Sequence, residues 1–359
     1  MSPQVGALSR SGLYPGQGDR QVQAFDYAQW GALKGVAVMA AKSEIRAGDV
    51  LLFNGDSFIS KAIRLFDGAP VNHAALALDG GQLGEAAGSG LRFASVAGAV
   101  AHNNFTVIRE LPDPIDVAPV VKRGQSYVQD GAKYAYQQIA FLAILGLTRQ
   151  VPLPPIGRRM MRAVLDKAAA ALNALVEGER QLMICSEYVY RCYNEAHDGA
   201  PPNPYSLNVL PGSFAAGEPS LVDWALALHD DRLPAPALIP TFDTPPDLAT
   251  VDTEAEAELG PLIGTYLAEV ESGAPALTFG DAEPDDALLQ SMVNFGAALE
   301  PAAPASAESA GSPPVTFTLP SPRRALERVR VIAADPNFVT PGDLLRTASL
   351  SDRFQLERG

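Results

Sequence analysis

The sequence predicts an α+β fold in which an antiparallel sheet packs on helices. Residues 44–112 alternate short apolar runs with Gly- and Asp-rich turns, a pattern typical of strands and hairpins. Residues 117–198 instead hold long apolar stretches at helical spacing. At about 100–200 residues per domain, a chain of 359 residues is long enough for this core and for long additions to it.

The first 43 residues precede this core. Residues 1–18 are rich in Gly, Ser and Pro and are expected to form a flexible leader. Residues 19–42 are expected to form a helix, because Asp19 is a suitable N-cap and apolar side chains recur at roughly helical spacing.

Strands and turns follow. The turn Asp79-Gly80-Gly81 joins two apolar runs, which is the pattern of a β-hairpin. Gly48 opens another short apolar run, which ends at the turn Asn54-Gly55-Asp56. We therefore expect strands at residues 49–53, 73–78, 83–86 and 106–109, with a short amphipathic helix at residues 57–66.

The third region is expected to be helical. Tyr188 and Cys192 lie one helical turn apart and, with the neighbouring row of Val189 and Tyr193, give one broad apolar face. We expect helices at residues 131–147, 158–176 and 186–196.

Acidic residues are concentrated in one segment. The chain carries a net charge of −14, and residues 241–310 hold fourteen Asp or Glu and no Lys or Arg. The segment is also rich in Pro and Ala, so we expect it to be partly disordered, with helical pieces near residues 259–270 and 285–299. Near the C-terminus, Thr340 can cap a short helix that has Pro341 at its first position.

Composition excludes several classes of protein. The acidic balance argues against a nucleic-acid partner. The longest apolar run, residues 139–147, is far shorter than the ~18 residues that a membrane helix needs. The N-terminus has no apolar core and so is no standard secretory signal, which predicts a cytoplasmic protein or one exported without a signal peptide. Two cysteines and four histidines form neither a disulfide framework nor a zinc-binding pattern.

Three residues have the features of a nucleophilic thiol site. Cys185 is expected at the start of a helix, where the dipole stabilises a thiolate. His73 lies where a turn enters a buried strand and could act as the base. Glu85 follows twelve residues later, beyond the hairpin turn, and so can lie beside His73 on the same sheet face to orient its ring.

Each residue also has a structural interpretation. Cys185 alone could be a small buried apolar residue, as we expect for Cys192. A single His before a strand is usually structural or solvated, and a single Glu is usually a surface charge. The order and spacing of all three together favour the catalytic interpretation.

The order of several motifs along the chain also favours the catalytic interpretation. A Gly-Asp strand comes first, then a His before small apolar residues, then Glu-Ala, and finally a distant Cys-Ser-Glu helix. This order resembles the circularly permuted papain-like superfamily, which includes YiiX-like NlpC-type hydrolases and lecithin:retinol acyltransferase-like enzymes. The matching segments are RAGDVLLF (46–53), SKAIRLFDGAPVNHAALAL (60–78), GEAAGSGL (84–91), GAKYAYQQIA (131–140), ICSEYVYRCYNEA (184–196) and VTPGDLLRTASL (339–350).

The resemblance implies a permuted papain-like fold in which the sheet packs on the nucleophile helix. It implies Cys185 as nucleophile, His73 as base and Glu85 as orienting residue, with no metal or organic cofactor. Many relatives have Tyr-Ser where this chain has Val71-Asn72, and Tyr-Asp where it has Tyr134-Ala135. Both departures bear on substrate choice.

The resemblance leaves the reaction open. It implies a thiol hydrolase that forms a thioester on an amide or ester, with cell-wall-type peptides as the favoured substrate. A lipid acyltransferase or phospholipase on the same scaffold is the alternative. A further alternative is a non-catalytic module that binds a partner through the acidic segment.

The resemblance also divides the chain. Residues 1–43 form the leader and N-terminal helix, residues 44–202 the catalytic core, and residues 337–359 its closing segment. Residues 203–336 are then an acidic insertion. We expect this insertion to be a solvated loop, a lid, or a docking site for a basic protein partner.

Overall fold

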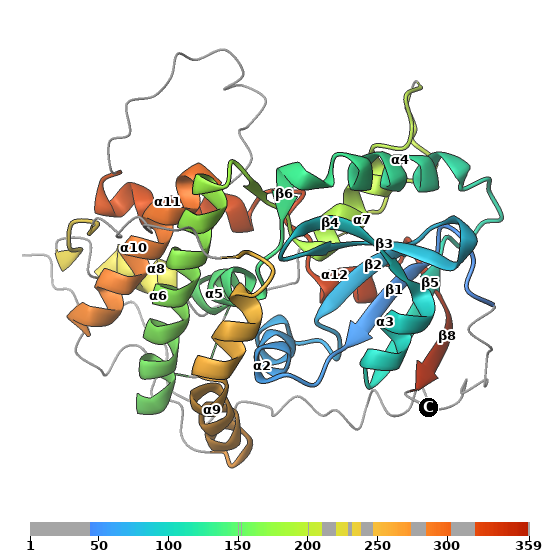
Figure 1. Cartoon of the computed structure of the whole chain (residues 1–359). Coiled ribbons are helices and arrows are strands. Elements are labelled where there is room, and N and C mark those ends of the chain that lie inside the picture. The colour runs from blue at the N-terminus through green and yellow to red at the C-terminus, as the bar shows by residue number, and fades with distance from the viewer. Residues whose placement is uncertain are drawn as a thin grey trace, which may run out of the picture.

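The computed structural model describes residues 44–149, 151, 153–199, 201–209, 220–228, 232–237, 247–273, 285–302 and 320–357. It has the expected α+β class, with an antiparallel sheet beside a group of helices (Figure 1). The helix expected at residues 19–42 lies outside the described residues. Within those residues, no helix combines the length and apolar character needed to cross a membrane.

The main sheet has six antiparallel strands in the order β4-β3-β2-β1-β5-β8. A small parallel pair joins β6 and β7. The four expected strands are present with shifts of at most one residue at either end, whereas β4, β6, β7 and β8 were not expected. The strands are β1 (Val50–Asn54), β2 (His73–Ala77), β3 (Gln82–Ala87), β4 (Gly90–Ser95), β5 (Phe105–Glu110), β6 (Tyr134–Ala135), β7 (Gln181–Leu182) and β8 (Ser351–Glu357).

Helices cover the sheet and extend beyond it. In Figure 1, α6, α9, α10 and α11 gather on the side away from the sheet, and α5 lies between the two groups. The helices are α2 (Phe58–Asp67), α3 (Val96–His102), α4 (Ala118–Gln129), α5 (Gln138–Thr148), α6 (Pro155–Glu177), α7 (Cys185–Asn194), α8 (Leu221–Leu228), α9 (Val251–Glu271), α10 (Asp286–Ala302), α11 (Pro322–Ala333) and α12 (Pro341–Arg346).

The prediction of one helix over residues 131–147 was wrong at its N-terminal half. Residues 131–133 form a 3₁₀ turn, and β6 pairs in parallel with β7. The backbone N–H of Tyr136 then donates to the carbonyl of Ala87 at 3.0 Å. Because these groups bond to other segments, the α-helix starts only at Gln138.

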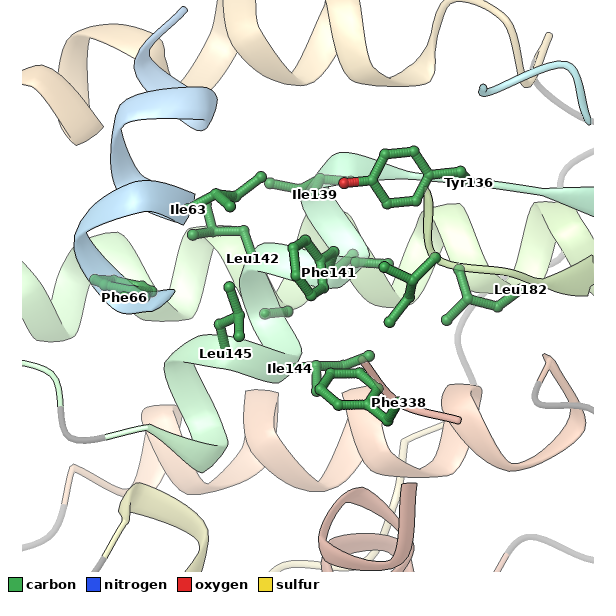
Figure 2. Packing of buried hydrophobic residues seen from close by; sticks show 14 of the residues in the cluster. Ile63, Phe66, Tyr136, Ile139, Phe141, Leu142, Ile144, Leu145, Leu182 and Phe338 are labelled. Atoms are coloured by element: carbon green, nitrogen blue, oxygen red, sulfur yellow. The ribbon is translucent and has the colours of Figure 1, made fainter. Parts of the chain in front are cut away.

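The apolar core centres on α5. Every side of this helix is apolar, and all its residues from Ile139 to Thr148 are buried, as expected for a helix surrounded by protein. Figure 2 shows its side chains packed against those of α2, such as Phe66, and against Phe338 from the chain before α12. This packing fixes α5, and therefore the chain segment that leads into it.

Alternation along β1 gives the sheet two buried faces. Val50 and Leu52 belong to the core shared with the helices, whereas Leu51 and Phe53 belong to a smaller cluster that includes α3 residues. A sheet covered on both faces holds its strand register firmly. This is the frame that positions β2 and β3.

The acidic segment contributes ordered helices to the described structure. The helices α9 and α10 contain the two helical pieces that we expected, and both pack on α6. The carboxylate of Glu256 accepts the backbone N–H groups of Phe58 and Ile59 at 2.7 and 2.9 Å, at the start of α2. Some of the acidic charge therefore stabilises the fold itself, by satisfying unpaired N–H groups at a helix end. The expected basic protein partner stays a prediction.

The closing segment returns to the sheet. As expected, Thr340 caps α12, and its hydroxyl accepts the Asp343 N–H at 3.0 Å. The buried guanidinium of Arg109 on β5 donates to the carbonyls of Leu344 and Leu345, both at 2.7 Å. These contacts hold the chain after α12 where β8 can pair with β5.

Candidate active site

Cys185 is the first residue of α7. The carboxylate of Glu187 reaches back and accepts the Ile184 N–H at 3.3 Å, which fixes the start of the helix. N–H groups in the first turn of a helix have no partner within the helix, and the dipole there favours an anion. A thiolate is therefore stabilised at this position. The whole Cys185 side chain is buried.

His73 and Glu85 lie side by side on neighbouring strands. The register pairs Leu76 with Gly84, so alternation puts His73 and Glu85 on the same sheet face. The Nε2 atom of His73 lies 3.1 Å from Oε2 of Glu85. The other carboxylate oxygen accepts two hydrogen bonds from Arg92 on β4, at 2.9 and 2.7 Å. The hairpin therefore brings together the two residues that the sequence proposed as base and orienting group.

Two aromatic rings hold the imidazole. Phe53, its cross-strand neighbour on β1, stacks with a centroid separation of 5.8 Å. Tyr136, from the segment between β6 and α5, stacks with a centroid separation of 5.9 Å. Because Glu85 takes Nε2, the ring nitrogen left for Cys185 is Nδ1. Among the described residues, Nδ1 has no hydrogen-bond partner.

Cys185 and His73 lie close enough to shift each other's pKa. Burial alone would lower the pKa of His73, but the neighbouring Cys185 thiolate and the Glu85 carboxylate outweigh burial and raise that pKa to about 10. Burial alone would raise the pKa of Cys185, yet the charge of His73 and the backbone at Ala74 outweigh burial and lower it. Each charged partner thus favours the charged form of the other. The arrangement supports a thiolate–imidazolium pair.

Glu85 stays ionised beside this pair. Burial would raise its pKa, but the hydrogen bond and charge of His73, followed by those of Arg92, lower it to about 2. A carboxylate that remains charged holds the imidazole in one orientation and stabilises its protonated form.

A pocket of about 230 Å³ opens beside the pair. The thiol of Cys185 is not among its walls. The sulfur is therefore not exposed to this pocket in the structure. The pocket is lined by His73, Glu85, Ala86, Ala87, Gly88, Arg92, Asn103, Tyr136, Gln138 and Asp252.

Sequence reasoning missed Tyr136, Arg92 and Asp252. Arg92 could have been found by alternation, because β4 follows the hairpin and places it directly opposite Glu85. Tyr136 was assigned to a helix interior. Asp252 lies in the acidic segment, and no local pattern links it to a pocket so distant in sequence. Within the described residues, no group of three or more His, Cys, Asp or Glu side chains is arranged to hold a metal ion.

The chain is similar to a curated protein that is named as a peptidase. It shares 26% identical residues over 157 positions with the probable lipoprotein peptidase YaeF of Escherichia coli (strain K12). The alignment covers 43% of this chain and 57% of YaeF, so it spans little more than half of that protein. No protein-family model matches the chain. No solved structure matches it either.

Proposed function

We propose that this chain is a cysteine-dependent hydrolase that cleaves an amide bond through a thioester on Cys185. The observation that carries the proposal is a buried thiol at a helix start beside an imidazole that Glu85 holds, each of which favours the charged form of the other. The similarity to a probable lipoprotein peptidase favours a peptide substrate. His73 and Glu85 precede Cys185 in the chain, which agrees with the permuted papain-like order.

The reaction follows from the site. The Cys185 thiolate attacks the carbonyl carbon, and the backbone N–H of Cys185 stabilises the oxyanion. The carbon–nitrogen bond breaks while the imidazolium of His73 gives its proton to the leaving amine. A thioester remains. Water, deprotonated by His73, then attacks the thioester, releases the acid and restores the thiol.

Alkylation of Cys185 against pH tests the proposal, with each modified peptide read by mass spectrometry. Cys192 is the internal control, because it lies on the same helix, is equally buried and has a pKa that burial raises. An ordinary thiol titrates near pH ~8.5. We expect Cys185 to react at half its maximal rate well below that pH, and His73→Ala to remove the difference.

Two results would contradict the proposal. One is a reactive Cys185 with the pH profile of an ordinary thiol. The other is peptide hydrolysis at near wild-type rates in Cys185→Ser or His73→Ala. A thioester that reacts with an added amine or alcohol faster than with water would change the assigned reaction from hydrolysis to acyl transfer.

A further inference from the structure

The acidic helix α9 reaches the candidate site through Asp252. Its Oδ2 accepts the backbone N–H of Gln138 at 2.9 Å, and its Oδ1 accepts that of Ile139 at 3.1 Å. These are the first two residues of α5. One carboxylate from α9 therefore satisfies two N–H groups at the start of the helix that follows Tyr136, which no local cap does.

A second contact joins the same two segments. The side chain of Gln137 is fully buried and donates from Nε2 to the carbonyl of Leu248 at 3.1 Å. That carbonyl also abuts Gly88, in the turn between β3 and β4, so closely that a Cβ at Gly88 would overlap it. Residues 248–252 are therefore held against both the β3–β4 turn and residues 136–139.

Residues 136–139 in turn hold the reacting pair. Tyr136 stacks on His73 with a centroid separation of 5.9 Å, and it lies near enough to Cys185 that the two groups shift each other's pKa. The backbone of Tyr136 is tied to β3 by its bond to Ala87. The ring of Tyr136 thus supports the imidazole of His73. The three residues that follow Tyr136 are the ones that hydrogen-bond to the acidic insertion.

We infer that Asp252 is a positioning residue, and that α9 of the acidic insertion completes the candidate active site by fixing the segment that bears Tyr136. The inference rests on the proposed function, since it assigns a role toward the Cys185–His73 pair. It also gives α9 a role that differs from a lid or a partner-docking surface.

The helix provides its own matched control. Glu256, one turn after Asp252, caps α2 in the same way, with two carboxylate oxygens on two N–H groups, but it does not line the pocket. Asp252 shares the pocket with His73, Glu85 and Arg92. Loss of its negative charge alone would lower the pKa of the thiol, because the thiolate would be repelled less. Loss of positioning would raise that pKa.

The experiment follows thiolate formation by ultraviolet absorbance against pH in the full chain, with Cys185→Ser subtracted as reference. This readout does not require a reagent to reach the buried sulfur. It compares the wild type, Asp252→Asn and Glu256→Gln. We expect the midpoint for Cys185 to rise by about one pH unit in Asp252→Asn, a tenfold change in the ionisation equilibrium. We expect it to stay unchanged in Glu256→Gln.

The inference is overturned, and the proposed function stands, if the ionisation midpoint of Cys185 in Asp252→Asn is lower than in the wild type. The same holds if that midpoint equals the one in Glu256→Gln. A wild-type midpoint near that of an ordinary thiol overturns the proposed function, and the inference with it. If Asp252→Asn does not fold, Asp252→Ser replaces it, because serine retains one acceptor for the helix end. The same two outcomes then apply.

Discussion

The Glu85 carboxylate contacts His73 through one oxygen and Arg92 through the other, with 3.1 Å between Oε2 and the imidazole Nε2. The guanidinium keeps the carboxylate in place, and the carboxylate keeps the ring in place. The candidate site is thus supported from three adjacent strands, β2, β3 and β4, rather than from a loop. Such a support fixes the orientation of the imidazole.

Glu85→Gln should separate charge from geometry. Glutamine retains an oxygen that can accept from His73 but carries no charge. We expect the pKa of His73 to fall and the pKa of Cys185 to rise by about one unit, because the imidazolium loses a stabilising partner. The alkylation profile of Cys185 measures this shift. Arg92→Gln should give a smaller shift of the same sign, and equal shifts would argue against direct support by Glu85.

Glu85 also predicts a dependence of stability on pH. Its folded-state pKa of about 2 is below the ordinary 4.5. Its contribution is therefore fully present above pH 4.5 and is lost as the pH falls through 2. At roughly 1.4 kcal/mol per pKa unit, the shift is worth a few kcal/mol. Denaturant unfolding across this range should show a shallower acid loss in Glu85→Gln than in the wild type.

Asp67 supplies a control of opposite sign. Burial raises its folded-state pKa to about 6. The folded state then binds more protons than the unfolded state between pH 3.8 and 6, so this group lowers stability as the pH rises through that range. Asp67→Asn should remove that decline. If the free energy of unfolding of Glu85→Gln and that of Asp67→Asn changed with pH in the same way, both the lowered pKa of Glu85 and the raised pKa of Asp67 would be contradicted.

Tyr136 is expected to have two separable effects on the thiol. Tyr136 lines the pocket, and its side chain contributes to lowering the pKa of Cys185. Tyr136→Phe should retain the ring and raise the pKa of Cys185. Tyr136→Ala should raise the pKa as well, but it should also increase the maximal alkylation rate, most of all for bulky reagents. An unchanged maximal rate in Tyr136→Ala would show that another side chain shields the sulfur.

Local patterns accounted for the hairpin and for the start of α7. Alternation and a Gly-rich turn are enough to put His73 beside Glu85, because a two-strand register is a short-range property. Tyr136 was misassigned because an apolar run does not reveal that Tyr134 and Ala135 pair with a strand formed much later in the chain. Asp252 could not be found, since a carboxylate that caps a distant helix looks the same in sequence as a surface charge.

The closing segment offers a test of how the chain after the insertion joins the core. Arg109 donates to the carbonyls of Leu344, Leu345, Thr347 and Leu350 and pairs with Asp352 at 2.8 Å. Arg109→Ala would leave those carbonyls without this partner. We expect a loss of about 1–3 kcal/mol in the free energy of unfolding, the cost of leaving buried acceptors without a partner, measured by urea denaturation.

Arg324 is the matched control, because its ion pair with Glu300 joins two helices of the insertion at a mostly exposed position. Arg324→Ala should cost no more than about 1 kcal/mol. If both variants lose the same small amount, the closing segment is not an energetic part of the core. If Arg109→Ala is clearly more destabilised than Arg324→Ala, the closing segment is an energetic part of the core despite the long insertion that precedes it.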